Sequence, residues 1–570
     1  MRRLLMTLLA APAFLGGCAS LPAEANVAAA DVQAGVVSAA DPRAAAAGLE
    51  MLRQGGSATD AAIAVMLALN VVEPQSSGIG GGGFMLWGGR DGLVETYDGR
   101  ETAPAGADGQ WFLDASGNPL PFMTAVVSGR SVGVPGNLRL AEEAHRRHGK
   151  LPWAKLFEPA IRLAQGGWTL SERGHEFLGN AKNRAAHQPE GLALYYDAAG
   201  QPLPVGTVLH NPALANTLGQ IAVHGAEWFY TGTNAAQIAA EVAAETPRAG
   251  AMTSGDVGAY RAKMRPEVCG TYRTYRICGM GPPSSGGTTV FAILKQLEGF
   301  DLHALGPQSP TFWHLFAESQ RLAFADRERY LADIDFVSVP VAGLIDPNYL
   351  AARGSLISAT GTMASVVAGT PQGVALAPPD GNEPEEHGTS HFVVVDRNGE
   401  AASYTSTVEG SFGSGITVGG YYLNNELTDF SFAPTVNGVP VANRVEGGKR
   451  PRSSMAPTLV YDAQGKLFIV VGAAGGATIP VQVARALIGV IDFGLTPEQA
   501  VALPMLFSPG DQVTIESGTM LVAMVPQLQA LGHRQVSPRG LPLKTNAIVR
   551  TAHGWAGAAD PRSEGVAVGE

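Results

Sequence analysis

Apolar residues recur at helical spacing through the first two thirds of the chain. This spacing predicts helices over residues 42–55, 57–72, 136–148, 153–165, 212–223, 287–298 and 309–332. Ser57 is the expected N-cap of the second of these helices. Later in the chain, short β-rich runs bounded by turn residues predict strands over 391–396, 401–406, 459–461 and 467–471, and a last helix is predicted over 479–493. The pattern therefore predicts a fold that combines helices with sheets.

A glycine-rich segment, SSGIGGGGFMLW at residues 76–87, lies between the second predicted helix and an apolar strand. It contains the spacing G-x-G-x-x-G of dinucleotide-binding loops. Such loops follow a strand and open a helix, so that the phosphates meet the helix N-terminus. Here the order is helix, glycines, strand. We therefore interpret the glycines as residues that allow tight packing.

Composition narrows the class of protein. The 570 residues are 45% hydrophobic and 16% charged, which is typical of a folded globule with a sizeable core. The net charge of −11 leaves no basic stripe for a phosphate backbone, so nucleic acid is not an expected partner and a small-molecule substrate is favoured. Length alone leaves the number of domains open.

The N-terminus has the features of an export signal. It begins Met-Arg-Arg, continues with an apolar run over residues 4–17 that is too short to span a bilayer, and reaches LGGC at 15–18. LGGC resembles the lipobox of bacterial lipoprotein precursors, which predicts a signal over 1–17, lipidation of Cys18, and a linker over 18–33. The alternative is an ordinary signal cut near residues 28–30. Either reading predicts an exported, periplasmic protein, and the first predicts a lipid anchor.

The two remaining cysteines, Cys269 and Cys278, flank a stretch that can turn back on itself. In an oxidising compartment a disulfide between them would stabilise the fold by roughly 2–3 kcal/mol. Two buried free thiols in strands are the alternative, and the sequence does not choose between them.

A polar, Pro-bearing segment with four acids, residues 377–388, separates the helix-rich part from the β-rich part and reads as an exposed junction. Directly after it, Thr389 stands at the edge of an apolar strand, preceded by Gly388. A threonine in this position is by itself an ordinary strand residue. Its meaning comes from the segments around it: YDGRETAP at 97–104, PPSSGG at 282–287, TSTVE at 405–409, NNELTDF at 424–430, KRPRSSMAPT at 449–458, GAAGG at 472–476 and ADPRS at 559–563.

Together these ordered segments resemble the gamma-glutamyltransferase family, over nearly all of the chain after the signal. The resemblance implies an α+β fold of the N-terminal-nucleophile hydrolase type, a four-layer αββα sandwich. It also implies self-cleavage between Gly388 and Thr389, which would give a large subunit over 34–388 and a small catalytic subunit over 389–570, held together as a heterodimer.

In this family the new N-terminal threonine is the nucleophile. Its own α-amine is the base that activates the hydroxyl, since an amine with an ordinary pKa near 8 is partly neutral around pH 7. Thr407 matches the threonine that orients the nucleophile. The backbone N–H groups of Gly475 and Gly476 match the donors to the oxyanion, with no side chain in the way.

The implied substrate carries a γ-glutamyl group, as glutathione does, and the pocket must bind both its α-carboxylate and its α-ammonium. Arg100 matches the arginine that pairs with the carboxylate, where a planar guanidinium suits bidentate contact. The serine pair that also binds the carboxylate is matched by Ser453 and Ser454. The α-ammonium positions are matched by Glu426 and Asp429, and a position that is Asn or Glu in the family is matched by Glu409. The acceptor, water or an amino acid or peptide, stays open, because the expected lid at 430–448 is short and lacks a tyrosine.

Three alternatives remain beside this reading. The related cephalosporin acylases share the fold but act on side chains without the α-ammonium, and Asp429 argues for the γ-glutamyl group. A serine hydrolase is suggested by G-x-S-x-G around Ser131, although the motif continues into Val134-Pro135-Gly136 and not directly into a helix. The third is a non-catalytic lipoprotein that keeps the fold for binding. His387 and His391 are four residues apart but not on one helix, so no metal is expected, and no organic cofactor is implied.

Overall fold

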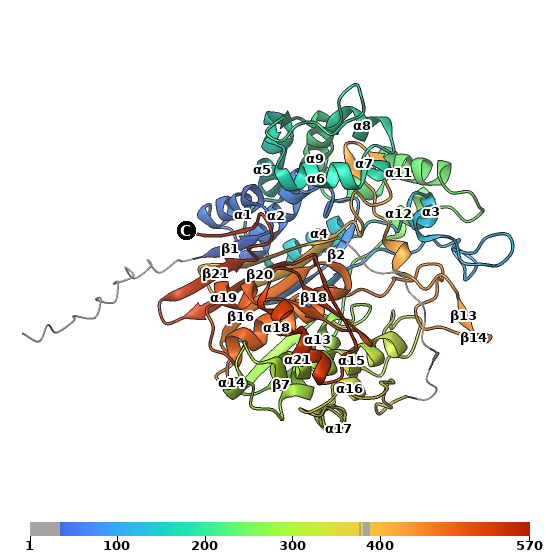
Figure 1. Cartoon of the computed structure of the whole chain (residues 1–570). Helices are drawn as coiled ribbons and strands as arrows, with labels where there is room; N and C mark the ends of the chain where they lie inside the picture. The colour runs from blue at the N-terminus through green and yellow to red at the C-terminus, as the bar shows by residue number, and fades with distance from the viewer. Residues whose placement is uncertain (1–34, 375–377, 380–387) are drawn as a thin grey trace, which may run out of the picture.

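The computed structural model describes residues 35–374, 378–379 and 388–570. Two β-sheets lie face to face, and helices cover the outer face of each sheet (Figure 1). This is the four-layer αββα sandwich expected from the sequence, so the fold class is confirmed. The predicted signal, the linker with Cys18, and junction residues 380–387 lie outside the described residues.

The first sheet has seven antiparallel strands in the order β22-β1-β9-β10-β2-β3-β6. Their bounds are β1 Val36–Ala39, β2 Gly82–Gly88, β3 Val94–Gly99, β6 Lys263–Met264, β9 Ser390–Val395, β10 Ala401–Thr407 and β22 Val566–Gly569. Along β9, Phe392 and Val394 pack toward the helices, whereas Val393 and Val395 pack toward the second sheet. Because both faces of β9 are covered, its sequence is a continuous apolar run instead of an alternating one.

The second sheet has six antiparallel strands in the order β21-β20-β16-β15-β8-β7. Their bounds are β7 Val268–Tyr272, β8 Tyr275–Gly279, β15 Thr458–Tyr461, β16 Leu467–Ala474, β20 Lys544–Thr551 and β21 Gly554–Ala559. Strands β16 and β20 face β9 across the inner layer, and the Ser403 hydroxyl donates to the carbonyl of Val471 at 3.1 Å. The start of β9 therefore faces the second sheet, near the ends of β10 and β16.

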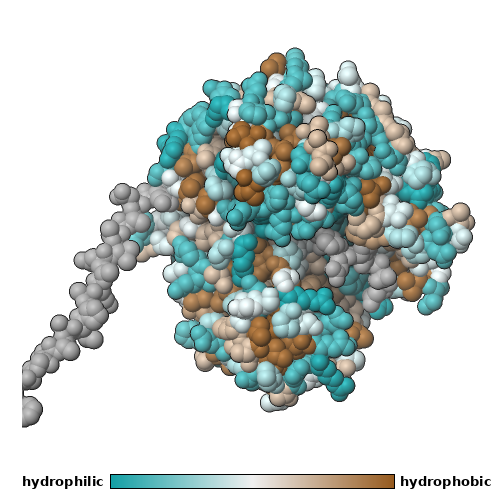
Figure 2. Space-filling view, turned by 45° about the horizontal axis from the view of Figure 1, so that its top comes forward, coloured by the Kyte–Doolittle hydropathy of each residue, from teal (hydrophilic) through white to brown (hydrophobic). Residues whose placement is uncertain are grey.

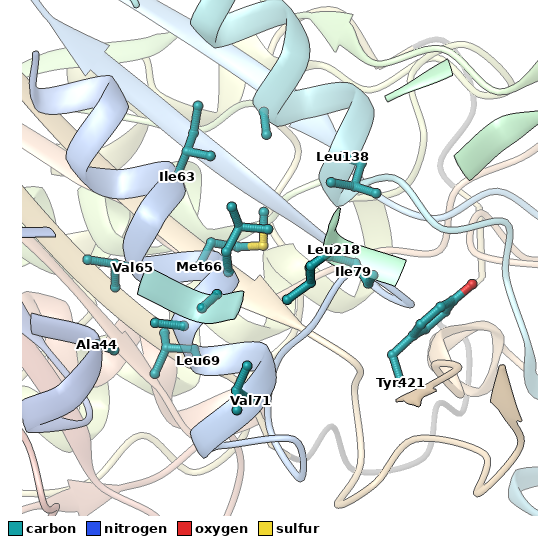
Figure 3. Packing of buried hydrophobic residues seen from close by; sticks show 14 of the residues in the cluster. Ala44, Ile63, Val65, Met66, Leu69, Val71, Ile79, Leu138, Leu218 and Tyr421 are labelled. Atoms are coloured by element: carbon teal, nitrogen blue, oxygen red, sulfur yellow. The ribbon is translucent and has the colours of Figure 1, made fainter. Parts of the chain in front are cut away.

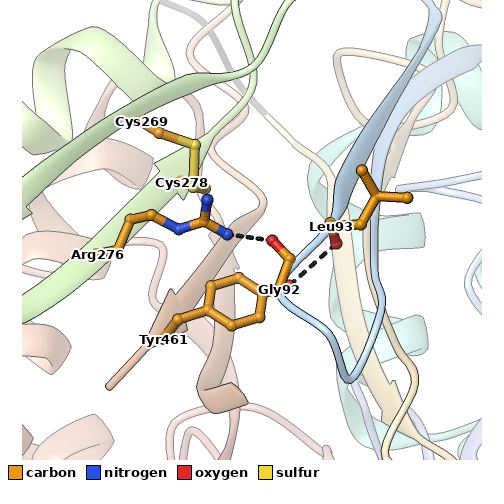
Figure 4. Close-up of a disulfide and its surroundings, with 6 residues drawn as sticks. All are labelled: Gly92, Leu93, Cys269, Arg276, Cys278 and Tyr461. Carbon is orange, nitrogen blue, oxygen red and sulfur yellow. Dashed lines mark hydrogen bonds between the residues drawn. A yellow bond between two sulfur atoms is a disulfide. The ribbon is translucent and has the colours of Figure 1, made fainter. Parts of the chain in front are cut away.

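Cys269 and Cys278 are direct cross-strand partners on β7 and β8, and a disulfide joins them (Figure 4). The pairing that the sequence left open is thus present in the structure. Beside it, the Arg276 guanidinium lies 4.7 Å from the centre of the Tyr461 ring and donates to the carbonyl of Gly92. These contacts fasten the edge hairpin of the second sheet to the loop between β2 and β3.

Helices α1, α2 and α4 cover the first sheet, with α5 and α9 packed outside them, and α13, α15 and α18 lie over the second sheet. Their bounds are α1 Pro42–Arg53, α2 Ala58–Val72, α4 Asn137–His148, α5 Trp153–Gly166, α9 Pro212–His224, α13 Gly286–Leu297, α15 Pro310–Tyr330 and α18 Ile479–Ile491. Figure 3 shows the layer between helices and first sheet, where Met66 and Leu69 of α2 lie near Leu218 of α9. Helix α2 is buried along its whole length, which its sequence of small and aliphatic residues permits.

All eight predicted helices are present, with ends that differ by one or two residues. Ser57 caps α2 as predicted, and it does so in a capping box with Asp60. The first predicted helix, 42–55, ends earlier, at Arg53, because Gly55 has a φ of 84° and leaves the helical conformation.

The glycine-rich segment is confirmed as a close-packing element. A Cβ at Gly81 would overlap the carbonyl oxygen of Thr407, and one at Gly83 would contact the carbonyl of Thr405 at 2.5 Å. Glycine therefore lets the start of β2 approach the end of β10, beside Thr407. The segment serves the site indirectly, by setting where β10 ends.

In the described part of the chain no helix combines the length and the apolar character needed to cross a membrane. The surface in Figure 2 is mixed, with hydrophilic residues over much of this face and hydrophobic residues between them.

The expected lid at 430–448 contains a small hairpin, β13 (Thr435–Val436) and β14 (Val439–Pro440), whose strands are largely exposed.

Candidate active site

Thr389 lies immediately before β9 and is 5% exposed. The last pair of the β9–β10 ladder joins Ser390 to Ser406, so Thr389 stands just outside the ladder. Its hydroxyl donates to the carbonyl oxygen of Gly388, which belongs to the peptide bond predicted to be cut. The candidate nucleophile and the candidate scissile carbonyl are therefore in direct contact in the uncut chain.

Gly388 is held in a conformation that suits only glycine. Its φ is 25°, on the left-handed side, and a Cβ at this position would overlap the carbonyl oxygen of Glu409. From the sequence, glycine at 388 is expected to leave its own carbonyl open to attack by Thr389. The structure adds that the chain before Thr389 passes too close to the backbone of residue 409 for any side chain.

Thr407 ends β10 beside the same peptide. Its hydroxyl lies 3.4 Å from the carbonyl oxygen of Gly388 and accepts a hydrogen bond from the backbone N–H of Glu409 at 2.7 Å. The family resemblance implies a bond to the Thr389 hydroxyl, whereas in this uncut chain the contact is with the carbonyl of Gly388, the candidate scissile group. Thr407 is thus positioned to polarise that carbonyl.

Glu409 follows in a strained turn. Its φ is 70°, which is uncommon for a residue with a side chain, and its carboxylate accepts from the side-chain amide of Asn425. Asparagine tolerates this backbone conformation better than most residues, which fits a position expected to be Asn or Glu. The strain brings the Glu409 backbone against Gly388 and its carboxylate into the site.

Arg100 is the buried cation of the site and is 1% exposed. It pairs with Glu426, lies 2.6 Å from the carboxylate of Asp429, and donates to the carbonyls of Pro451 and Arg452 at 3.2 and 2.8 Å. The two carboxylates and two carbonyls fix the plane of the guanidinium.

The two acids converge because of their local backbone. Glu426 and Asp429 are the first and last residues of a 3₁₀ turn, in which side chains three positions apart stand above one another. Both therefore reach the same guanidinium. Of the Glu426 carboxylate, Oε2 is buried and has no hydrogen-bond partner among the described residues, which makes it an unused acceptor inside the site.

Glu101, next to Arg100, was not found by sequence reasoning. It is fully buried, neither carboxylate oxygen has a partner among the described residues, and burial raises its pKa to about 8. At neutral pH this carboxyl group is mostly protonated. The only sequence feature that points to Glu101 is that it lies in the YDGRETAP segment, next to Arg100.

Ser453 and Ser454 point to different surroundings. Ser453 lines the cavity at Thr389, and its hydroxyl accepts from the backbone N–H of Met455 at 3.2 Å. The Ser454 hydroxyl accepts from Arg327 of α15 at 2.6 Å, and Ser454 is not among the residues that line the cavity. Arg327, which also donates to Ser285 at 2.9 Å, had no signal in the sequence, because it lies within a long helical pattern.

The glycine pair closes the site on the side of the second sheet. Gly475 has a φ of 132° and Gly476 one of 61°, and a Cβ at Gly475 would overlap the carbonyl oxygen of Pro542. Position 475 therefore requires glycine, and the left-handed φ at position 476 favours it. Gly476 lines the cavity with Thr389, whereas Gly475 lies behind it, after the end of β16.

One small cavity brings most of the predicted site residues together. Its lining is Arg100, Thr389, Thr407, Glu409, Glu426, Asp429, Ser453, Met455, Gly476 and Ile479. Met455 and Ile479 form an apolar wall that sequence reasoning missed. Eight predicted residues, far apart in sequence, thus line one small cavity, and among them are two threonine hydroxyls, one cation and three carboxylates.

The alternative nucleophile does not have such surroundings. Ser131 is fully buried and donates to the carbonyls of Val126 and Ser128, both at 2.8 Å. His391 makes a local hydrogen bond through Nδ1 to the Thr405 hydroxyl at 2.9 Å, and burial lowers its pKa to about 3. Within the described residues, no group of three or more His, Cys, Asp or Glu side chains could hold a metal ion.

Comparison with known proteins agrees with this geometry. The sequence model of the gamma-glutamyltranspeptidase family matches residues 44–570. The chain belongs to the gamma-glutamyltranspeptidase family. It is similar to the glutathione hydrolase proenzyme of Bacillus subtilis (strain 168), with 35% identity over 94% of this chain and 91% of that protein. Members of this family are enzymes with the N-terminal-nucleophile hydrolase fold.

Two further proteins that are similar to this gamma-glutamyltranspeptidase are acylases by name. The acylase ACY 1 proenzyme of Pseudomonas sp. (strain V22) is 34% identical over 94% of this chain and 93% of that protein. The crystal structure of cephalosporin acylase from Bacillus halodurans superposes with a TM-score of 0.83 and 27% identity, covering 97% of this chain and 99% of that one. The fold alone therefore does not choose the acyl group.

Proposed function

We propose that this family member is a γ-glutamyl transferase and hydrolase that acts on γ-glutamyl amides such as glutathione, with Thr389 as its nucleophile. The observation that carries the proposal is the shared cavity, in which Thr389 lies with Arg100, Glu426 and Asp429. A γ-glutamyl group needs one cation for its α-carboxylate and an anion for its α-ammonium, and this cavity offers both.

The first step is self-cleavage. The Thr389 hydroxyl oxygen attacks the carbonyl carbon of Gly388, the carbon–nitrogen bond breaks, and the Thr389 nitrogen takes up the hydroxyl proton. Water then hydrolyses the resulting ester and leaves a carboxylate on Gly388 and a free hydroxyl and α-amine on Thr389. The contact of the Thr389 hydroxyl with the Gly388 carbonyl supports this step. The products are a large fragment that contains the linker 18–33 and the large subunit, 34–388, and a small subunit, 389–570, and the two remain together as a heterodimer.

Substrate binding uses the cluster around Arg100. The α-carboxylate binds Arg100 and Ser453, with the Ser454 segment behind them held by Arg327. The α-ammonium binds Asp429 and the unused Oε2 of Glu426. Each charge of the zwitterion would thus lie beside a group of opposite charge. Buried, charge-assisted hydrogen bonds such as these are among the stronger contacts available to a protein.

Acyl transfer then uses one residue as nucleophile and base. The Thr389 α-amine accepts the hydroxyl proton, the oxygen attacks the γ-carbonyl carbon, and the protonated amine returns the proton to the leaving amine. Backbone N–H groups at Gly475 and Gly476 stabilise the oxyanion and so lower the barrier; loss of one such donor typically raises the barrier by about 3–4 kcal/mol. The γ-glutamyl ester is released to water or to the amine of an amino acid or peptide. Glu409 and Thr407 line the same cavity and orient the groups around Thr389.

We also propose that the protein is exported to the periplasm with a signal over 1–17 and a lipid on Cys18. The basic start, short apolar run and LGGC sequence support this proposal. Mass spectrometry of the N-terminal peptide from membrane fractions tests it. A diacylated or triacylated Cys18 is expected, and an unmodified N-terminus near residues 28–30 would contradict the lipid anchor.

The test of the activity compares wild type with Thr389→Ala by intact mass and by turnover of γ-glutamyl anilide. We expect two fragments with a new Thr389 N-terminus and turnover in wild type, and neither in the variant. Glutaryl anilide, which lacks only the α-ammonium, is assayed in parallel. Preference for glutaryl anilide would favour the acylase activity that two relatives carry in their names, and an uncut, inactive wild type would favour a binding module.

A further inference from the structure

A buried ion pair lies directly behind the candidate nucleophile. Lys544 is the first residue of β20, and Glu73 is the C-cap of α2. Lys544 Nζ lies 2.8 Å from Glu73 Oε2, and the two side chains are 3% and 2% exposed. The pair crosses the sandwich, because α2 covers the first sheet and β20 belongs to the second.

The ammonium group has two further neighbours, both at the start of β9. Its Nζ lies 3.4 Å from the carbonyl oxygen of Thr389 and 3.3 Å from the hydroxyl of Ser390. The Ser390 hydroxyl in turn donates to Glu73 Oε2 at 2.7 Å. An ammonium group has three N–H donors, and Glu73, Thr389 and Ser390 provide an acceptor for each.

Stability alone does not explain why this pair is buried. Removing two charges from water costs about as much as their attraction returns, so an apolar pair of similar volume is often as stable. The pKa of Lys544 is lowered, first by burial, which shows that the cost is present here.

Thr389 needs an anchor on its carbonyl side for two reasons. It stands one residue before the ladder that begins at Ser390, so the sheet does not fix its carbonyl. Once the peptide bond to Gly388 is cut, Thr389 also loses its covalent connection on the amino side. The carbonyl that Lys544 contacts is then the main-chain group through which Thr389 can still be held.

Lys544 is also connected to the glycine pair. In the second sheet it is the cross-strand partner of Ala474, the residue before Gly475. One side chain thus links the strand that leads to the glycine pair with the carbonyl of Thr389. A fixed separation between nucleophile and oxyanion donors is what an acyl transfer requires.

We propose that Lys544, held by Glu73, is a positioning residue that fixes the main chain of Thr389 relative to Gly475 and Gly476. This inference rests on the proposed function, in which Thr389 is the nucleophile. Lys544 touches neither substrate nor the reacting atoms, and it acts through the Thr389 carbonyl.

The charge of Lys544 has a second consequence. A cation this near the Thr389 α-amine disfavours the ammonium form of that amine, so it keeps the base neutral at lower pH. The other charged groups that act on the Lys544 ammonium are Arg173 and Asp41, besides Glu73. Those that share the cavity with Thr389 are Arg100, Glu409, Glu426 and Asp429. Substituting Lys544 leaves all of these in place, so the change in the pH profile reports on Lys544 and its partner.

The test compares Lys544→Met, Lys544→Arg and Glu73→Gln with wild type. For each we would measure the time course of self-cleavage, kcat and KM for γ-glutamyl anilide, and the acid limb of kcat/KM against pH. We expect Lys544→Met to lower kcat about 10-fold or more, with KM nearly unchanged. Its acid limb should move up by about one pH unit. Lys544→Arg keeps the charge and should restore part of kcat and most of the acid limb.

A matched control separates positioning from loss of a buried ion pair. Glu318 is fully buried and lies 2.7 Å from Arg321, away from the cavity residues. Glu318→Gln should leave kcat, KM and the acid limb unchanged, even if the melting temperature falls. If Lys544→Met does not fold, Glu73→Gln carries the test, since it keeps the size of the side chain and should show a smaller loss of kcat in the same direction.

The inference would be overturned if Lys544→Met kept the kcat, the cleavage rate and the acid limb of wild type. It would also be overturned if Glu318→Gln showed the same losses as Lys544→Met. Failure of the proposed function looks different, because wild type itself would then be uncut or inactive toward γ-glutamyl anilide. An active wild type, an inactive Thr389→Ala and an unaffected Lys544→Met would reject the positioning role alone.

Discussion

Gly388→Ala is expected to slow self-cleavage while leaving the mature enzyme intact. The alanine must adopt a left-handed φ, which costs about 1–2 kcal/mol, and its Cβ would overlap the carbonyl of Glu409. Relieving an overlap of this kind typically costs another 1–2 kcal/mol or more. If the sum of about 2–4 kcal/mol is lost from the reactive geometry, cleavage slows by about 30- to 1,000-fold.

The assay follows the uncut chain and the two fragments by gel and intact mass after synthesis. The new alanine stays at the C-terminus of the large fragment, so activity per cleaved molecule should equal that of wild type. Gly465→Ala is the control, because Gly465 has a φ of 73° but open space around its Cβ position. Cleavage of Gly388→Ala at the wild-type rate would refute the argument, and equally slow cleavage of Gly465→Ala would assign the effect to backbone strain in general.

Three further predictions concern recognition and stability. Asp429→Asn should lower kcat/KM for γ-glutamyl anilide by about 10- to 100-fold, and for glutaryl anilide by much less, because it removes the charged partner of the α-ammonium; equal losses for both substrates would contradict this role. Burial raises the pKa of Glu101 from 4.5 in the unfolded chain to about 8, so the folded protein binds this proton more tightly. The stability gained from that proton is fully present below about pH 4.5 and is lost as the pH rises through 8. In Glu101→Gln, unfolding free energies measured from pH 5 to 8 should therefore fall less with pH than in wild type, and an unchanged slope would show that another group is responsible. Replacing Cys269 and Cys278 by serine should lower the free energy of unfolding by about 2–3 kcal/mol in denaturant titration and leave kcat unchanged, because β7 is the edge strand of its sheet; a loss of kcat at full folding would contradict that separation.

Local pattern predicted the helices well, since apolar spacing and caps act within one segment. The capping box at Ser57 and the apolar run of β9 are cases in which neighbouring residues determine the structure. Several strands were missed, among them β1, β20 and β22. Their residues become strands through pairing with segments hundreds of positions away, such as Val36 with Gly569, and single-sequence periodicity carries little of that information.

The candidate site was predicted through motif resemblance, and the structure shows why residue chemistry alone would not have sufficed. Arg100 and Asp429 are 329 positions apart and meet only through the fold. Glu73 and Lys544 belong to no quoted segment, and each reads in the sequence as an ordinary charged residue near the end of an element. Their meaning depends on burial and on their distance from Thr389, which only three-dimensional structure provides.

The strand order of the first sheet bears on what the proposed cut can do. Strands β1, β2, β3 and β6 would belong to the large fragment, and β9, β10 and β22 to the small one, in the order small, large, small, small, large, large, large. The second sheet is also shared, but with a single boundary: β7 and β8 of the large fragment lie together at one edge, beside four strands of the small one. Strands of the two proposed fragments therefore pair with one another within both sheets, and neither fragment retains a complete sheet. The proposed cleavage would free the α-amine of Thr389 without creating two independent bodies, and separating the two fragments would require unfolding both.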